Sequence, residues 1–192
     1  MTSAAILAGG RAQRLDGLDK SQLRVAGRTI LERQLAALNG CVDRVLLVGY
    51  RGDPPGDERI TLVDDRLPDR GPLGGLDAAL VAAGDAAVLL LACDMPRVTT
   101  RLLSYMVSRL GDADAVVPLT ERGYHPLCAV YAQSCRVPVR RRLERGQLRM
   151  LDLLGDLRIR AIDATELEGL GGADHLLANL NTRADIDALE SL

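Results

Sequence analysis

Short apolar runs alternate with amphipathic stretches along most of the chain. The apolar runs predict buried strands at 3–7, 44–48, 60–63, 87–92 and 115–118. The stretches between and after them predict helices over 30–38, 76–83, 100–110, 133–145 and 148–154. Strands and helices that alternate at these lengths favour an α/β fold, with a mostly parallel central sheet and helices on both faces.

Capping and turn residues place several boundaries. Thr29 is suited to cap the first helix, and Asn39-Gly40 is a normal helix end. Residues 23–25 form a brief extended piece that ends in the Ala26-Gly27 turn. Further elements are an added strand at 124–131, a last strand at 158–162, and a final helix capped by Thr182 with Asp185.

Composition narrows the class of protein. A chain of 192 residues fits one domain with one core, so residues 1–192 are expected to form a single domain. The net charge of −2 gives no overall field for nucleic acid or membrane binding. The start lacks a signal-peptide pattern and no apolar run reaches 18 residues, so we expect a cytoplasmic protein. The four cysteines show no C-x-x-C spacing, which disfavours zinc and disulfides.

The first strand opens into a basic, glycine-rich loop. Gly9 and Gly10 let the backbone N–H groups approach an anionic ligand, and Arg11, Arg14 and Lys20 add positive charge. The glycine spacing matches neither G-x-G-x-x-G nor G-x-x-x-x-G-K-[ST]. The loop is therefore a candidate phosphate site of another kind.

Lys20 is the only lysine among 24 basic residues. The absence of Phe and Trp and the abundance of Ala, Gly, Leu and Arg suggest GC-rich codons, a bias that replaces lysine by arginine where either serves. A lysine that persists in the glycine-rich loop indicates a site where arginine does not serve.

Acidic residues follow two of the predicted strands. Asp94 comes after the strand 87–92, which Pro96 terminates, and Asp65 comes after the strand 60–63. Ligands of parallel α/β sheets bind at the carboxyl ends of the strands, where the glycine-rich loop also lies. A carboxylate beside phosphates is the usual arrangement for Mg²⁺, so Asp94 is the first candidate metal ligand and Asp65 a candidate neighbour. The competing structural role for Asp94 is an N-cap of the next helix.

Several motifs together resemble the molybdenum cofactor guanylyltransferases, in order and over nearly the whole chain. The matching segments are Leu7-Ala-Gly-Gly-Arg11 with Arg14, Gly17, Asp19 and Lys20, then Arg70-Gly-Pro-Leu-Gly-Gly75, Ala92-Cys-Asp-Met-Pro96, His125-Pro126 and Asn179-Leu-Asn-Thr182. The Leu-Ala-Gly-Gly opening and the late Asn-x-Asn-Thr favour the guanylyl branch over the cytidylyl relatives.

The resemblance implies a Rossmann-like nucleotidyltransferase fold and transfer of GMP from GTP to Mo-molybdopterin, with Mg²⁺ and release of pyrophosphate. It is compatible with a protein partner, either a molybdenum-insertion protein or an acceptor apo-enzyme. Alternatives are cytidylyl or other nucleotidyl transfer to molybdopterin or a sugar phosphate, and a non-catalytic nucleotide-binding regulator. Retention of both Lys20 and Asp94 argues against the regulator.

The resemblance also implies roles for individual residues. The implied contacts to the nucleotide are Leu7, Ala8, Gly9, Gly10, Lys20, Asp65 and Asp94, with Asp94 also holding the metal. Arg14 matches a loop needed for turnover, so Arg14, Lys20 and Asp94 are the candidate catalytic residues. Asn179 and Asn181 match positions that face the pterin, and His125 is either a substrate contact or a core histidine.

Two features differ from the family pattern or lie outside it. Leu15 replaces a usual Met and Asp16 a common glycine, so Asp16 must point away from the triphosphate or share the metal. Arg141, Arg145 and Arg149 follow i, i+4 and i+8 spacing and are expected on one helix face. The basic stretch 136–149 is either a solvated helix side or a contact for the acceptor's anionic groups.

Overall fold

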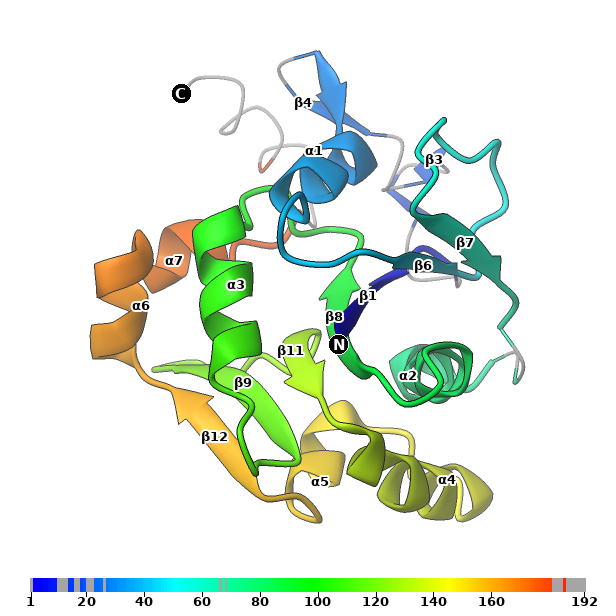
Figure 1. Cartoon of the computed structure of the whole chain (residues 1–192), viewed down its shortest axis with the longest axis vertical. Helices are drawn as coiled ribbons and strands as arrows, with labels where there is room; N and C mark the ends of the chain where they lie inside the picture. The colour runs from blue at the N-terminus through cyan, green and yellow to red at the C-terminus, as the bar shows by residue number, and fades with distance from the viewer. Residues whose placement is uncertain are drawn as a thin grey trace.

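The computed structural model describes residues 2–9, 14–15, 18–19, 23–25, 27–65, 67, 69–180 and 185. Within these residues the chain forms one large central sheet between two layers of helices (Figure 1). The strand order is β10-β9-β11-β8-β1-β6-β7, with β12 paired to β9. The predicted fold class, an α/β fold with a mostly parallel sheet, is confirmed.

The centre of the sheet is parallel and one side of it is mixed. The parallel strands are β1 (Thr2–Leu7), β6 (Val45–Val48), β7 (Ile60–Val63) and β8 (Ala87–Ala92). The mixed side holds β9 (Ala115–Thr120), β10 (Gly123–Tyr124), β11 (Cys128–Tyr131) and β12 (Ile159–Ile162). Strand β11 is antiparallel to both β8 and β9, whereas β12 is parallel to β9.

Helices cover both faces of the sheet. One face carries α1 (Ile30–Ala37), α3 (Thr100–Ser108), α6 (Ala164–Leu170) and α7 (Ala173–Leu176). The other face carries α2 (Gly71–Ala82), α4 (Arg136–Glu144), which follows the 3₁₀ turn η3 (Gln133–Cys135), and α5 (Met150–Leu154). Figure 1 shows the two groups on opposite sides of β8 and β1.

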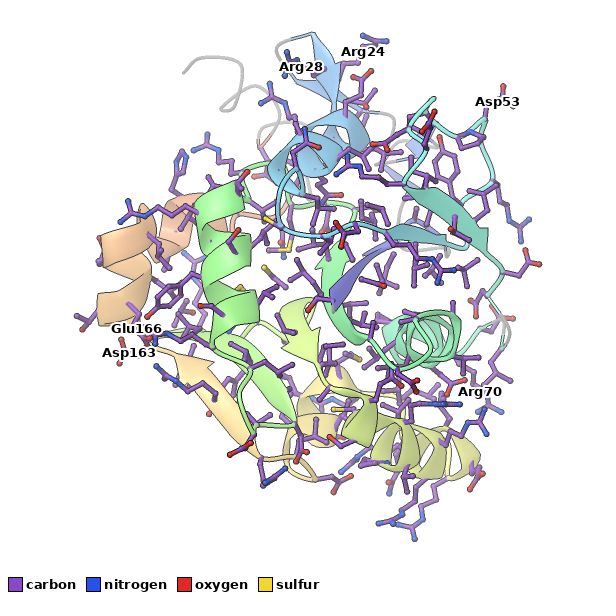
Figure 2. The ribbon with its side chains drawn as sticks, viewed as in Figure 1. Arg24, Arg28, Asp53, Arg70, Asp163 and Glu166 are labelled. Carbon is purple, nitrogen blue, oxygen red and sulfur yellow. The ribbon has the colours of Figure 1, made fainter. Side chains whose placement is uncertain are left out.

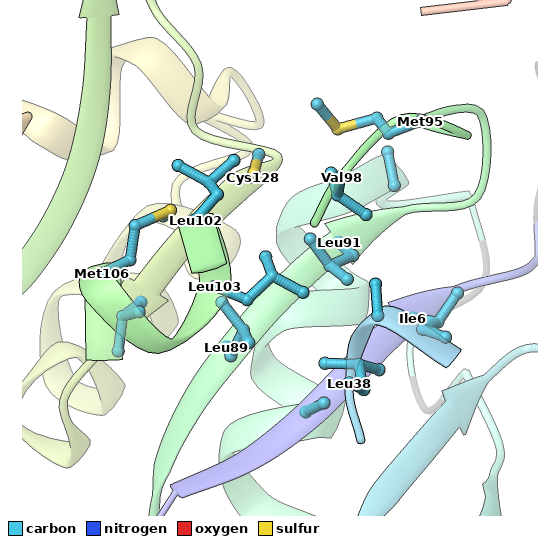
Figure 3. Packing of buried hydrophobic residues seen from close by; sticks show 14 of the residues in the cluster. Ile6, Leu38, Leu89, Leu91, Met95, Val98, Leu102, Leu103, Met106 and Cys128 are labelled. Carbon is cyan, nitrogen blue, oxygen red and sulfur yellow. The ribbon is translucent and has the colours of Figure 1, made fainter. Parts of the chain in front are cut away.

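Alternation along the central strands divides the core in two. In β1, Ala4 and Ile6 point into the layer with α1 and α3, whereas Ala5 and Leu7 point into the layer with α2. Figure 3 shows the first layer, where side chains of α3 pack over Leu89 and Leu91 of β8. Strands buried on both faces explain why the sequence shows them as continuous apolar runs.

Local signals set the boundaries near the first helix. Thr29 and Glu32 form a reciprocal capping box at the start of α1, with Glu32 N–H donating to Thr29 Oγ1 at 3.1 Å. Two short hairpins precede it, β2 (Arg14–Leu15) with β3 (Leu18–Asp19), and β4 (Arg24–Val25) with β5 (Arg28–Thr29). The predicted extended piece at 23–25 is therefore confirmed as one arm of a hairpin.

Two predicted elements are wrong in extent. The single strand expected at 124–131 is divided into β10 and β11, because His125 and Pro126 lie in a turn where Cys128 N–H donates to His125 O at 3.1 Å. The shared face expected for Arg141, Arg145 and Arg149 does not form. Helix α4 ends at Glu144, and Gly146 takes a φ of 68° that breaks the helical path before Arg149.

Helices α6 and α7 were not predicted from the sequence. The signal for α6 is a second capping box, in which Glu166 N–H donates to Asp163 Oδ1 at 2.9 Å and Asp163 N–H donates to Glu166 Oε2 at 3.1 Å. Figure 2 labels this pair at the end of α6 that follows β12. The final helix expected after Thr182 lies outside the described residues, apart from Asp185.

Across the part of the chain that the structure describes, the helices are too short or too polar to cross a bilayer.

Candidate active site

The carboxyl ends of three parallel strands meet at one edge of the sheet. Ala8 N–H donates to Val48 O at 2.9 Å, and Gly49 N–H donates to Val63 O at 2.8 Å, so the ladder continues past the last strand residues. Leu7, Ala8 and Gly9, which end β1, therefore lie beside the residues that end β6 and β7. These three positions were expected to contact the nucleotide.

Gly9 and Gly49 pack directly against each other at this edge. A Cβ built on Gly9 would come within 2.8 Å of both Cα and O of Gly49, and one built on Gly49 would come within 2.9 Å of Gly9 Cα. Gly49 also has a φ of 71°, in the left-handed region that favours glycine. Glycine at both positions is what allows the end of β1 to approach the end of β6.

The beginning of α2 packs on the same edge. A Cβ on Gly75 would lie 2.7 Å from Leu7 Cδ2, so the helix lies directly against the Leu7 side chain. A Cβ on Gly74 would lie 3.7 Å from Asp65 Oδ1, and Leu67 N–H donates to that carboxylate oxygen at 3.2 Å. The N-cap residue Arg70 makes no side-chain capping bond to the first turn. The glycines of the 70–75 motif thus bring α2, β1 and Asp65 together.

Asp94 follows β8 at the same edge and is half-buried. Its carbonyl oxygen accepts a hydrogen bond from Leu180 N–H at 2.9 Å, which ties it to the segment that carries Asn179. The competing N-cap role for Asp94 is wrong, because Thr99 caps α3 and its Oγ1 accepts from Leu102 N–H at 3.3 Å.

A pocket of about 440 Å³ opens beside the Asp94 turn. Its lining comes from the start of α2, the 92–96 turn, the β10–β11 turn, the α4–α5 connection and the C-terminal segment: Pro72, Met95, Tyr124, His125, Pro126, Leu127, Cys128, Leu148, Arg149, Met150, Leu151 and Asn179. A pocket of this volume with an apolar wall and a few polar groups suits a small organic ligand. His125 and Asn179, predicted as acceptor contacts, both line it.

His125 stands in the pocket wall, where it is hydrogen-bonded. Partial burial, helped by the nearby Arg122 charge, lowers the pKa of His125. Its Nε2 lies 2.9 Å from Thr120 Oγ1, and its backbone N–H donates to Pro118 O at 2.9 Å. The structure places His125 at the pocket rather than in the core.

The donor set at this edge fits a metal that keeps most of its ligands as water and phosphate oxygens. Among the described residues, groups of three or more His, Cys, Asp or Glu side chains that could enclose a metal are absent. Asp94 and Asp65 instead supply separate carboxylates at the ends of β8 and β7. One or two carboxylates beside a triphosphate is the pattern that Mg²⁺ prefers in proteins.

Some predicted site residues are not covered by this geometry. Gly10, Lys20 and Asn181 lie outside the described residues, and of Arg14 only the backbone in β2 is described. Asp16, the departure from the family pattern, lies outside them as well.

The structure adds residues that sequence reasoning did not select. Gly49 was missed because it stands alone after its strand, and its φ is visible only in the fold. Tyr124 was also missed, and it lines the pocket together with Arg149, which is 25 residues away and belongs to the basic stretch already considered as an acceptor contact. A signal for Arg149 existed, because Gly146 separates it from α4 and predicts that it belongs to a connecting loop.

The fold is that of a nucleotidyltransferase. Residues 4–160 match the model of the MobA-like NTP transferase domain, so the chain belongs to that family. Archaeoglobus fulgidus molybdopterin-guanine dinucleotide biosynthesis protein A has a similar structure, with a TM-score of 0.80 at 23% identity over 100% of this chain and 97% of that one.

Two relatives narrow the family further. The molybdenum cofactor guanylyltransferase of Desulfosudis oleivorans is 30% identical over 188 residues, covering 97% of this chain and 93% of that protein. The probable molybdenum cofactor guanylyltransferase of Methanothermobacter thermautotrophicus is 37% identical over 175 residues, covering 84% and 88%. The chain is thus a member of the molybdenum cofactor guanylyltransferases, and the resemblance found in the sequence is confirmed.

Proposed function

We propose that this chain transfers GMP from GTP to the terminal phosphate of Mo-molybdopterin, giving the guanine dinucleotide form and pyrophosphate. The observation that carries the proposal is the adjacency of two half-sites. The nucleotide edge formed by Gly9, Gly49 and Asp65 and the pocket with His125 and Asn179 lie on either side of the Asp94 turn.

The donor half of the site binds GTP in this proposal. Leu7, Ala8 and Gly9 present backbone at the edge where Gly49 leaves room, and Asp65 contacts the nucleoside. Gly10, Arg14 and Lys20 hold the phosphates from the glycine-rich loop, where charge and free N–H groups suit a polyanion. Asp94 holds Mg²⁺, which when bound neutralises phosphate charge.

The acceptor half holds the pterin. Tyr124 and Pro126 offer flat apolar surface in the pocket, while His125, Arg149 and Asn179 offer polar contacts. Asn181 adds a contact from the same C-terminal segment. Arg149 is exposed at the pocket, and its guanidinium group suits the anionic phosphate of the acceptor.

The reaction is an in-line displacement at the α-phosphorus of GTP. An oxygen of the acceptor phosphate forms the new P–O bond, and the bond to pyrophosphate breaks. Catalysis requires alignment of two anions and charge neutralisation, so no protein nucleophile takes part. Cys128 is unsuited to that role in any case, because burial raises the pKa of its thiol to about 12.

Three broader parts belong to the same proposal. Residues 1–192 act as one nucleotidyltransferase domain, since both helical layers pack on one sheet. The reaction consumes GTP in the cytoplasm. The labile pterin is exchanged with a protein partner, a molybdenum-insertion protein or an acceptor apo-enzyme.

The test combines nucleotide selection with one substitution. GTP with Mg²⁺ should raise the melting temperature more than CTP, ATP or UTP, and Mo-molybdopterin should trigger GTP-dependent pyrophosphate release. Asp94→Asn should keep the fold and abolish that release, because an amide retains the shape but not the charge. A larger shift of the melting temperature with CTP would refute the choice of GTP as the donor. Normal pyrophosphate release by Asp94→Asn at limiting Mg²⁺ would refute the role of Asp94 as the metal ligand.

A further inference from the structure

Gln34 is a polar side chain enclosed in an otherwise apolar helix face. It is 0% exposed and lies in α1 among the buried residues Ile30, Leu31 and Leu35. Burial of an amide is unfavourable unless its polar atoms are hydrogen-bonded, so its contacts explain what it stabilises.

The amide of Gln34 bridges the turn that carries Asp94. Nε2 donates to Ala92 O at 2.7 Å and to Met95 O at 3.2 Å. These carbonyls stand immediately before and after the Cys93-Asp94 pair. The two N–H groups of one side chain therefore fix the distance across the turn.

Two backbone hydrogen bonds hold the same turn from other directions. Ala92 N–H donates to Leu127 O at 2.8 Å, and Leu180 N–H donates to Asp94 O at 2.9 Å. The turn is thus held by α1, by the segment before β11 and by the C-terminal segment. Of these three attachments, the one from Gln34 is made by a side chain and can be removed by substitution.

We propose that Gln34 is a positioning residue for Asp94, whose carboxylate it holds in the orientation that binds the divalent metal with GTP. The proposal rests on the proposed function, because it takes Asp94 as the metal ligand. Residues that orient a metal ligand through hydrogen bonds typically cost 10- to 100-fold in metal affinity or activity when changed. Replacement of the Gln34 amide should therefore weaken metal binding by about 10- to 100-fold.

The chain offers a matched control at the other end of the same strand. Gln133 Nε2 donates to Leu80 O at 3.1 Å and to Ala86 O at 2.6 Å, directly before β8 begins. In both side chains Oε1 is buried and accepts no hydrogen bond. Gln34 and Gln133 therefore each donate two hydrogen bonds from Nε2 to backbone carbonyls, the fully buried Gln34 at the site and the partly buried Gln133 at the opposite edge of the sheet.

The experiment compares Gln34→Met with Gln133→Met in the full chain. Methionine keeps the length of the side chain and removes both donors. Urea denaturation reports the stability of each variant, and titration with Mn²⁺ in the presence of a non-hydrolysable GTP analogue reports the metal Kd. Gln34→Met should raise the Mn²⁺ Kd by about 10- to 100-fold, whereas Gln133→Met should stay within about threefold of the parent protein.

A second variant covers the case in which Gln34→Met does not fold. A protonated glutamic acid in Gln34→Glu still donates one hydrogen bond to the turn, whereas the ionised carboxylate repels the carbonyl oxygens of Ala92 and Met95. The Mn²⁺ affinity of Gln34→Glu relative to the parent should therefore improve as pH falls from 8 to 6. Gln133→Glu, as its control, should show a constant ratio.

Asp94→Asn in the same titration separates the two proposals. Parent-like Mn²⁺ binding by Asp94→Asn would overturn the metal assignment. Loss of Mn²⁺ binding by Asp94→Asn, together with equal Kd values for Gln34→Met and Gln133→Met, would overturn only the role of Gln34.

Discussion

Substitution of Gly49 by alanine tests the close contact on which the nucleotide edge depends. The residue has a φ of 71°, and an added Cβ would lie 2.9 Å from Gly9 Cα and 3.3 Å from Gly9 N. Both contacts are with backbone atoms, so no side-chain rotation relieves them. Either the end of β6 or the end of β1 must move.

The expected loss of stability in Gly49→Ala has two parts. An alanine in the left-handed region costs roughly 1–2 kcal/mol, and an overpacked contact adds about 1–3 kcal/mol. The free energy of unfolding should therefore fall by about 2–5 kcal/mol. Because the displaced backbone is that of Gly9, the Kd for GTP should also rise about tenfold, equivalent to about 1.4 kcal/mol.

Gly40→Ala separates the two parts. Gly40 has a φ of 74°, almost equal to that of Gly49, but nothing lies within 4 Å of its added Cβ. Gly40→Ala should therefore show the backbone cost alone and leave GTP binding unchanged. Urea denaturation and fluorescence titration with a labelled GTP measure both quantities. Equal losses of stability for the two variants, with parent-like GTP binding by Gly49→Ala, would refute the reasoning.

Three further predictions concern charge and burial. Lys20→Arg keeps the charge but replaces a compact ammonium group by a planar guanidinium group, so kcat at saturating GTP should fall on the order of 10²-fold. A kcat within about threefold of the parent would show that position 20 needs only a positive charge. Hydrogen bonds from Arg158 and Ser134 hold the pKa of Asp114 below its usual range, so its contribution to stability is present above about pH 4 and is lost as pH falls further. Asp114→Asn should thus lower the free energy of unfolding at pH 7 and flatten its decline below pH 4 in acid titrations. Iodoacetamide at pH 8 should label the half-exposed Cys41 and spare Cys128, whose thiol pKa is about 12, as mass spectrometry of digests would show.

Much of the sheet was predictable because its central strands are buried on both faces. Such strands read as uninterrupted apolar runs, and the predicted segment 87–92 coincides with β8. The first helix was predictable from Thr29, whose capping box requires only residues three apart. The helices α6 and α7 were missed although Asp163 and Glu166 form the same local signal, because the apolar positions between 164 and 176 are few.

The candidate site was predictable residue by residue where a strand end or a motif marked it. Asp94 and Asp65 follow strands, and the resemblance supplied His125 and Asn179. Sequence spacing could not show that Asn179 and His125 line one pocket, since 54 positions separate them. Gly146 marked a break before Arg149 in the sequence, but the direction in which Arg149 leaves the helical face of Arg141 depended on the φ of Gly146.

The sequence by itself determined most of the order of strands and helices, the parallel character of the central sheet and the edge at which ligands are expected. These features follow from local periodicity and from the chirality of the connections, which each short segment carries on its own. Only the tertiary structure decided which backbone segments touch: Gly9 with Gly49, Leu7 with Gly75, and Gln34 with the Asp94 turn. Such contacts join residues far apart in the chain, and they depend on how the layers pack rather than on any local pattern.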